Sequence, residues 1–199
     1  MLVKDVMTRP AITVGLNTSI KEALALLDEH AITALPVVAD HDHVVGVVSE
    51  ADLIRDGIPP DIRRHLAYAP AELRTLPPHI VSEVMNAHPI TVSPDGDLQD
   101  AIELMTTTAI KSLPVVDHNG RVVGVVSRRD VVHVLARPDH LLAAEADDLF
   151  RRLGLDWLVD VRDGVAFVSG PVIDHESALA TSAVGTIPGI TGVTIRASL

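Results

Sequence analysis

The chain of 199 residues contains no cysteine, which excludes a disulfide, a thiolate metal site and a cysteine nucleophile. Aromatic residues make up only 2% of it, so few faces exist on which nucleic-acid bases could stack. The formal net charge of -11 predicts no nucleic-acid partner and disfavours contact with anionic lipid. No apolar run approaches the roughly 20 residues that span a bilayer, and the start lacks a secretion pattern. We therefore expect a cytoplasmic protein.

Motifs for common chemistries are also missing. The sequence has no Walker A loop, Rossmann glycine fingerprint, His-Glu-x-x-His or Gly-x-Ser-x-Gly motif. Ser127, Asp130 and His133 have the residue types of a hydrolytic triad, but they fall on consecutive turns of one predicted helix. The two histidines within residues 40–43 are interpreted as part of a solvated polar turn. We expect no catalytic residue, no metal site and no required cofactor.

An internal repeat organises most of the chain. Val6-Met7 recurs as Val84-Met85, and Asp52 recurs as Asp130. Residues 35–38 recur as 113–116, and every pair is separated by 78 positions without a gap. A fixed period of this kind indicates two copies of one structural unit.

Each copy predicts the element order β-α-β-β-α. In copy one, a β-rich run at 12–14 is followed by a capping box at Ser19 and an amphipathic helix face. Two β-branched runs come next, and Ser49 is a suitable N-cap for a second helix. Copy two repeats these signals, with strands at 90–92, 113–116 and 122–126 and helix starts at Asp97 and Ser127.

The chain divides into four segments on this pattern. Repeat 1 covers residues 1–57 and repeat 2 covers 81–137. Residues 58–80 form a proline-rich linker, with one helical turn predicted near 61–66. Residues 138–199 form a small third domain.

The repeated motif resembles the CBS domain. Its signature, present twice, is Val-Met, Thr-Val, Leu-Pro-Val-Val and Gly-Val-Val-Ser-x-x-Asp over roughly residues 1–137. The resemblance implies a tandem pair, a Bateman module, in an α/β (α+β) fold whose two units are related by a pseudo-two-fold axis. It also implies clefts for adenosine-containing ligands and pairing of modules into homodimers.

The residues of copy two favour a phosphorylated ligand. Ser127 begins a helix whose N-terminus attracts anions, and Arg128 and Arg129 follow in its first turn, where cations are normally disfavoured. Asp130 can accept hydrogen bonds from ribose hydroxyls, and Lys111 adds a further cation. The resemblance implies that copy one completes this pocket, with Ile32 against the adenine. The backbone that reads the base edge is then that of Pro10, Ala11, Ile12 and Thr13.

Pseudo-symmetry implies a second pocket. Its predicted residues are Asp52, Ser49, Thr33, Ile110, Pro89, Ile90 and Thr91. The helix start of copy one is acidic, so this pocket should repel phosphate and either stay empty or take an uncharged or cationic adenosyl compound. For both aspartates a plain alternative stays open, because Ser-x-x-Asp at a helix start is a common capping arrangement.

The last sixty residues predict the order α-β-β-α-β. A helix covers 139–153, and the strands on either side of Asp163-Gly164 have a tight hairpin signal. A helix that begins near Asp174 and a last strand at 191–197 follow. The segments Val161-x-Asp-Gly-Val165, Val168-Ser-Gly170 and Ile187-Pro-Gly-Ile190 resemble a BON domain. Nine acidic residues against four arginines make a protein contact a better expectation here than a membrane contact.

Two functions remain open. The first is a non-catalytic regulatory protein that binds an AMP, ADP, ATP or adenosyl ligand between the CBS repeats and signals through a conformational change. The second is a structural, dimerising adaptor with vestigial clefts that presents the BON-like domain to a protein or envelope partner. An enzyme acting on nucleotides ranks behind both.

Overall fold

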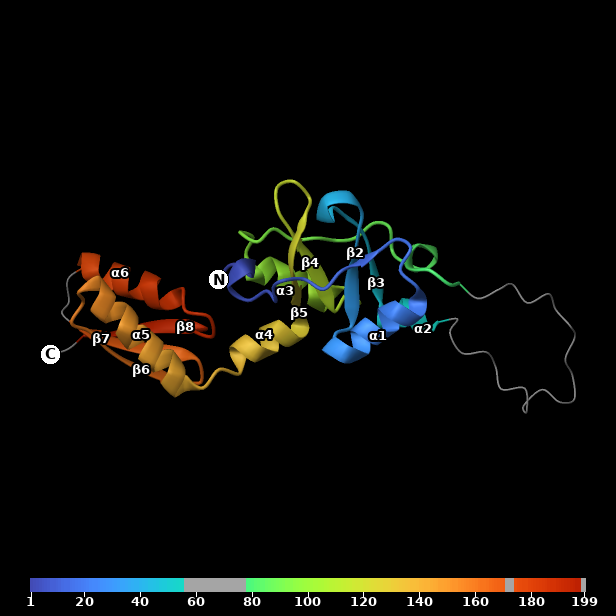
Figure 1. Ribbon diagram of the computed structural model, residues 1–199. Coiled ribbons are helices and arrows are strands. Elements are labelled where there is room, and N and C mark those ends of the chain that lie inside the picture. Colours follow the sequence, from blue (N-terminus) through green and yellow to red (C-terminus); the bar gives the residue numbers. More distant parts are fainter. Residues whose placement is uncertain (56–77, 171–173, 198–199) are drawn as a thin grey trace, which may run out of the picture. The chain divides into compact units, whose positions relative to one another are not determined.

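The computed structural model describes residues 1–55, 78–170 and 174–197 (Figure 1). The helical turn predicted near 61–66 lies outside these residues. The described chain divides into two compact units. Unit 1 contains Met1–Met7, Asp95–Thr108 and Val126–Leu199, and unit 2 contains Thr8–Pro94 and Ala109–Val125. The boundary between the units therefore passes through repeat 2.

Repeat 1 has the predicted order and lies wholly in unit 2 apart from its first residues. Its elements are β1 (Val14–Gly15), α1 (Ile20–His30), β2 (Ala34–Val38), β3 (Val44–Ser49) and α2 (Glu50–Ile54). The strands form a sheet in the order β1-β2-β3, with β1 parallel and β3 antiparallel to β2. The fully buried side chains of Leu35, Val37 and Val48 pack with Ala23 and Leu27 of α1 into an aliphatic core.

Local hydrogen bonds close both ends of α1. The Ser19 hydroxyl accepts a hydrogen bond from the Glu22 N–H at 3.1 Å, which satisfies one of the free donors at the helix start. At the other end Ala31 adopts a left-handed conformation, with φ of 50°, and its N–H bonds back to the last turn.

Repeat 2 contains α3 (Leu98–Thr107), β4 (Ser112–Val116), β5 (Val122–Ser127) and α4 (Arg128–Leu135), and β4 and β5 form a two-stranded sheet. The prediction of a strand at 90–92 was wrong in extent, since of these three residues only Val92 pairs, in an isolated parallel bridge to Val115. Pro94 follows two residues later and has no N–H for a further ladder hydrogen bond.

The first residues of each repeat form a short arm that contacts the other repeat. The first arm contains η1 (Val3–Asp5), and the Val3 N–H donates to the Gly96 carbonyl at 3.0 Å, just before α3. The second arm contains η4 (Val81–Glu83), and the Val81 N–H donates to the Thr18 carbonyl at 2.9 Å, just before α1. The first helix of each repeat thus begins against the arm of the other repeat.

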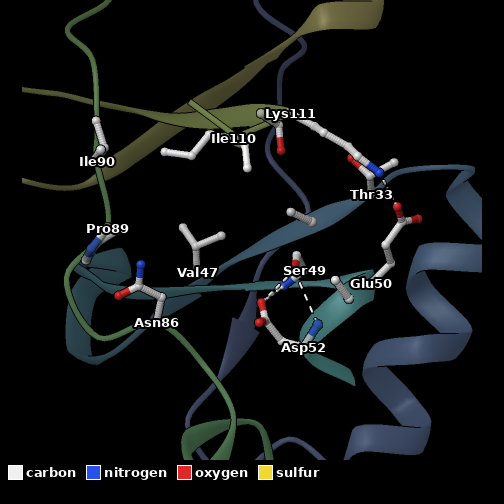
Figure 2. Close-up of a pocket in the computed structure, with 14 residues that line it drawn as sticks. Thr33, Val47, Ser49, Glu50, Asp52, Asn86, Pro89, Ile90, Ile110 and Lys111 are labelled. Carbon is white, nitrogen blue, oxygen red and sulfur yellow. Dashed lines mark hydrogen bonds and ion pairs between the residues drawn. The ribbon is translucent and has the colours of Figure 1, made fainter. Parts of the chain in front are cut away.

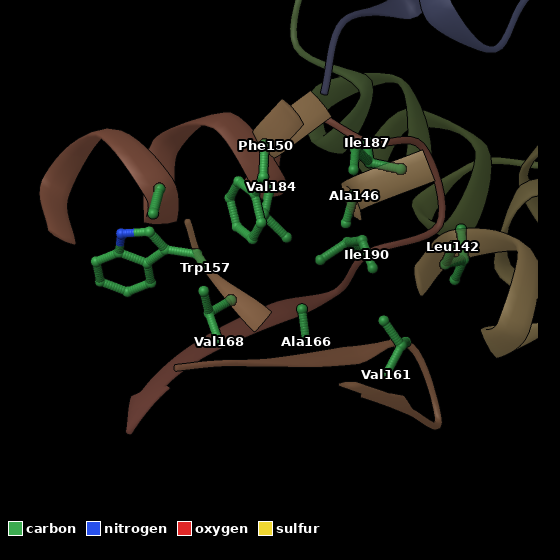
Figure 3. Packing of buried hydrophobic residues seen from close by; sticks show 11 residues of the cluster. Leu142, Ala146, Phe150, Trp157, Val161, Ala166, Val168, Val184, Ile187 and Ile190 are labelled. Carbon is green, nitrogen blue, oxygen red and sulfur yellow. The ribbon is translucent and has the colours of Figure 1, made fainter. Parts of the chain in front are cut away.

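The C-terminal domain also has the predicted α-β-β-α-β order. Its elements are α5 (Asp139–Leu153), β6 (Leu158–Arg162), β7 (Val165–Gly170), α6 (Asp174–Gly185) and β8 (Gly192–Ala197). The sheet order is β6-β7-β8, and α5 and α6 cover one face of the sheet with a separate apolar core (Figure 3). Asp163 and Gly164 have φ of 50° and 75°, which confirms the tight hairpin.

A specific junction fastens this domain to α4. Arg137, directly after α4, donates to the Pro188 carbonyl and pairs with Glu145 at 2.6 Å. Asp139, at the start of α5, accepts hydrogen bonds from the N–H groups of Asp163 and Gly164 at 2.8 and 3.0 Å. The connection between α4 and the last domain is therefore short; Arg137 binds it to that domain, and Asp139 ties the start of α5 to the hairpin within the domain.

Candidate functional site

A pocket with a cavity volume of about 250 Å³ lies within unit 2, between the end of β3 and the segment that leads into β4 (Figure 2). Its apolar wall consists of Ala34, Val47, Ala51, Pro89, Ile90, Ala109 and Ile110. Its polar wall consists of Thr33, Ser49, Glu50, Asp52, Asn86, Lys111 and Ser112. Figure 2 shows Ile90 and Pro89 on one side of the cavity and Glu50 and Asp52 on the other. The pocket therefore has an apolar end and a charged end.

The pocket corresponds to the second of the two predicted sites. Of the residues predicted there, the structure brings together Asp52, Ser49, Thr33, Ile110, Pro89 and Ile90. Thr91 was predicted with them but is not among the described residues of the wall. Lys111, which the sequence analysis assigned to the other pocket, lines this one beside its neighbour Ile110.

Asp52 is held at the edge of the pocket by a capping box. Its Oδ2 accepts from the Ser49 hydroxyl at 2.5 Å and from the Ser49 N–H at 3.0 Å, while its own N–H points to the Ser49 Oγ at 3.4 Å. Its Oδ1 lies 3.6 Å from Arg55, and the Asp52 side chain is 25% exposed. The alternative in which Asp52 caps α2 is thus present in the structure, and the same carboxylate also faces the cavity.

An ion pair crosses the charged end. The Lys111 Nζ lies 2.5 Å from the Glu50 Oε1, and the two side chains are 55% and 42% exposed. Glu50 is the first residue of α2 and Lys111 directly precedes β4, so the pair joins the two repeats within unit 2. The pocket whose helix start was predicted to be acidic therefore also contains a basic residue, and that residue is paired with Glu50.

Glu50 and Asn86 are pocket residues that sequence reasoning missed. Both stand next to motif positions, Glu50 after the cap Ser49 and Asn86 after the repeated Val84-Met85. Asn86 is positioned by a backbone bridge to Val47, in which each N–H donates to the other residue's carbonyl at 3.0 and 2.9 Å. This pairing depends on tertiary contacts, and only the closeness of Asn86 to the repeated motif could have pointed to it.

The residues predicted for the first pocket are divided between the units. Ser127, Arg128, Arg129 and Asp130 belong to unit 1. Pro10, Ala11, Ile12, Thr13, Ile32 and Lys111 belong to unit 2. Within unit 1, Asp130 repeats the capping box of Asp52, since its Oδ2 accepts from the Ser127 hydroxyl at 2.5 Å and the Ser127 N–H at 2.7 Å.

Arg128 has a structural role that the sequence did not indicate. Its Nη2 donates to the carbonyls of Met105 and Thr108 at 2.5 and 3.3 Å, where α3 ends. A cation at this point satisfies carbonyls that have no partner within the helix. The position of Arg128 in the first turn of α4 is therefore explained without a phosphate.

Two features are absent from the described part of the chain. No group of three or more His, Asp or Glu side chains in that part of the chain is arranged to hold a metal ion. None of the described helices combines the length and the apolar character needed to cross a bilayer.

Together these features define a two-repeat α/β module with a small amphipathic pocket beside a capped helix start. The CBS domain family model matches residues 3–57 and 81–137, so the chain belongs to the CBS domain family and carries a tandem pair, a Bateman module. A CBS domain-containing protein of Dictyostelium discoideum is 31% identical over 137 residues, which are 69% of this chain and 92% of that protein. YhcV of Bacillus subtilis, another CBS domain-containing protein, is 32% identical and the match covers 65% of this chain and 81% of that one.

Solved structures have the same fold. CBSX2 of Arabidopsis thaliana in complex with AMP is 32% identical with a TM-score of 0.54, covering 66% of this chain and 93% of that one. The CBS domain pair of protein MJ0100, in complex with 5′-methylthioadenosine and S-adenosyl-L-methionine, is 29% identical with a TM-score of 0.54, covering 67% and 94%.

Proposed function

We propose that this protein is a non-catalytic regulator that binds an adenosine-containing ligand in the Asp52 pocket and signals by a conformational change. The observation that carries the proposal is the pocket itself, in which an apolar end for a base adjoins a carboxylate suited to ribose hydroxyls. CBS pairs are regulatory modules, and two similar pairs were crystallised with AMP or with adenosyl compounds. These complexes support the ligand class.

The pocket suggests how such a ligand would lie. The adenine would occupy the apolar end against Val47, Ile90 and Ile110, where burial of its faces stabilises the complex. The Asn86 amide, with a donor and an acceptor, also lines the cavity and can pair with the edge of the base. The ribose would then lie beside Asp52, whose carboxylate accepts hydrogen bonds from hydroxyl groups.

The second ligand site, at Asp130, remains part of the proposal. Ser127 and Asp130 have the same mutual geometry as Ser49 and Asp52, which supports an equivalent use of both aspartates. Arg129 is exposed in the first turn of α4, a helix of eight residues. A phosphorylated ligand is the one that this cation and the helix N-terminus favour.

Signalling requires that the ligand have unequal affinity for two arrangements of the module. The C-terminal domain is suited to report such a change, because Arg137 fastens it to the end of α4. Trp157, the only tryptophan of the chain, is buried in the core of that domain. Its fluorescence therefore gives an internal readout of ligand-dependent change.

Isothermal titration calorimetry with adenosine, 5′-methylthioadenosine, S-adenosylmethionine, AMP, ADP and ATP tests the function. We expect Asp52→Ala to weaken binding at its pocket about tenfold or more, as for the loss of a hydrogen bond to a charged group. Circular dichroism would check that the variant folds, because Asp52 also caps α2. Binding of every compound with unchanged affinity and stoichiometry by Asp52→Ala would remove the site assignment.

A structural adaptor is the second candidate, and two observations favour it. The capping boxes account for Asp52 and Asp130 without a ligand. Val132 and Leu135 on α4 are 63% and 57% exposed, which suits a homodimer through the CBS module. Light scattering of the protein as it elutes from a size-exclusion column, with and without nucleotide, would measure whether it is a dimer. The adaptor would be favoured by a dimer whose formation does not change with any adenosine compound. It would also be favoured by a protein partner that binds the BON-like domain equally with and without these compounds.

A further inference from the structure

The charges of the Asp52 pocket are arranged unevenly. Of the described residues that line the cavity, Lys111 is the only cation, and Glu50 and Asp52 are the acidic residues. The Lys111 ammonium is 2.5 Å from the Glu50 carboxylate, so its charge is neutralised inside the wall. Asp52 faces Arg55 at 3.6 Å, but Arg55 is outside the wall and its side chain is 71% exposed. The cavity surface therefore offers a ligand more negative than positive charge.

From this arrangement we infer that Glu50 is the specificity-determining residue of the pocket and restricts it to adenosine compounds with a neutral or cationic 5′ substituent. The inference rests on the proposed function. A 5′-phosphate beside Asp52 would have to take Lys111 from Glu50, and it would then leave two carboxylates close to the phosphate. Like charges at such short range disfavour binding, whereas a neutral or positive group meets no such repulsion.

The position of the ion pair explains why the 5′ group is the part that is sensed. Figure 2 shows Glu50 and Lys111 beside Ser49 and Asp52, away from Ile90 and Pro89. A nucleoside with its base at the apolar end and its ribose at Asp52 would direct its 5′ carbon toward this pair. The cavity volume of about 250 Å³ is also below the roughly 300–1,000 Å³ common for ligand pockets. A nucleoside fits such a space better than a nucleoside polyphosphate.

The counterpart of Glu50 in repeat 2 shows that a carboxylate is not required by the fold at this point. Arg128 occupies the equivalent place, 78 positions later, after the same cap serine and at the first position of the helix that follows it. Helix α2 begins with a glutamate and helix α4 with an arginine, so the fold accepts either residue type at this position. The fold therefore does not determine the residue type at position 50, and a glutamate there can select the ligand.

The test is calorimetry with adenosine, 5′-methylthioadenosine and AMP on full-length protein in the Asp130→Ala background, which limits the heat to one pocket. We expect adenosine and the thioether to bind more tightly than AMP. Glu50→Gln keeps the size of the side chain, frees Lys111, and should raise AMP affinity on the order of tenfold. Adenosine affinity should change by less than about twofold. Adding Lys111→Met should abolish the gain for AMP.

Glu29→Gln, an exposed carboxylate on α1 outside the pocket wall, is the matched control for the change in net charge and should leave all affinities unaltered. Tight AMP binding by the Asp130→Ala protein, or a Glu50→Gln variant in that background that still prefers adenosine to the same degree, would overturn the inference while leaving the ligand site intact. Failure of all three compounds to bind would instead reject the assignment of an adenosine ligand to the Asp52 pocket, and the inference with it.

Discussion

The two CBS repeats have the same helix start but use its first residue in opposite ways. Ser49 and Ser127 hold Asp52 and Asp130 at the same hydroxyl-to-carboxylate distance of 2.5 Å. The next residue after each serine differs in charge and in partner. Glu50 pairs with Lys111 in the pocket wall, whereas the Arg128 guanidinium donates to carbonyls at the end of α3. The cap maintains the scaffold, and the position beside it is where the copies diverged.

The largest expected effect tests whether the cores of the two repeats are equivalent. Leu35 and Leu113 occupy matching places and are fully buried. Truncation of either to alanine should lower the free energy of unfolding by about 2–5 kcal/mol, because a cavity is left in an aliphatic core. Urea unfolding followed by circular dichroism measures both variants. A typical single substitution lowers the free energy of unfolding by about 1 kcal/mol. A loss below about 1 kcal/mol in only one of the two variants would therefore show that the repeats differ in packing.

Gly46 tests a feature of repeat 1 that shapes the pocket. A Cβ at this position would lie 2.7 Å from the Met85 sulfur and 2.9 Å from the Asn86 carbonyl. Gly46→Ala should cost about 1–3 kcal/mol and displace Asn86, so ligand affinity should fall with stability. Gly15→Ala is the control in the same sheet, since its Cβ would meet only Thr18 at 3.8 Å. Equal thermal midpoints for the two variants would contradict this account.

Removal of the cap serine separates structure from ligand binding. Ser49→Ala and Ser127→Ala should each cost about 0.5–2 kcal/mol, as is usual for loss of an N-cap. Only Ser49→Ala should also weaken an adenosine ligand of the Asp52 pocket, because Ser49 lines that cavity. Thermal melts with and without adenosine would compare the two losses. A ligand-dependent shift reduced equally in both variants would mean that the effect comes through the fold alone.

The smallest effect concerns the turn between β4 and β5. The N–H groups of Arg121 and Asn119 donate to the Asp117 carboxylate at 2.9 and 2.8 Å and lower the pKa of Asp117 from its usual 3.8. Since the folded pKa is depressed, the stabilisation is present above the unfolded pKa and is lost as pH falls through the folded one. Carbon-detected NMR titration of the carboxylate between about pH 5 and about pH 1 would measure the midpoint. Asp117→Asn should flatten this part of the stability profile, and an Asp117 midpoint above 3.8 would refute the assignment.

Much of the fold followed from local signals in the sequence. The cap residues and the Asp163-Gly164 hairpin depend only on neighbouring residues, the duplication is visible as a fixed period, and the structure has all three. The strand at 90–92 was overestimated, because a β-rich composition does not show which residues find hydrogen-bond partners, and of these three only Val92 forms a bridge. Helix α5 was predicted to its residue limits, since Pro138 and Gly154 flank it.

The candidate site was harder to predict because it depends on which residues meet across the chain. Pseudo-symmetry identified six wall residues of the Asp52 pocket, yet it gave Lys111 to the other pocket although its neighbour Ile110 was placed in this one. The partners of Lys111 and Arg128 lie 61 and 23 positions away, at separations that no periodic pattern reveals. The arginines at the start of this helix predicted a bound anion, whereas in the structure the Arg128 guanidinium donates to backbone carbonyls.

The first and second arms limit how the chain can be cut into fragments that keep their contacts. A fragment cut at residue 81 would retain repeat 2 but lose Val3, whose N–H bonds to Gly96 ahead of α3. A fragment that ends before residue 78 would likewise leave α1 without Val81 and its contact at Thr18. Either half on its own would have to borrow the missing arm from another molecule. The tandem chain thus has the connectivity of a swapped pair of single repeats that have been fused end to end.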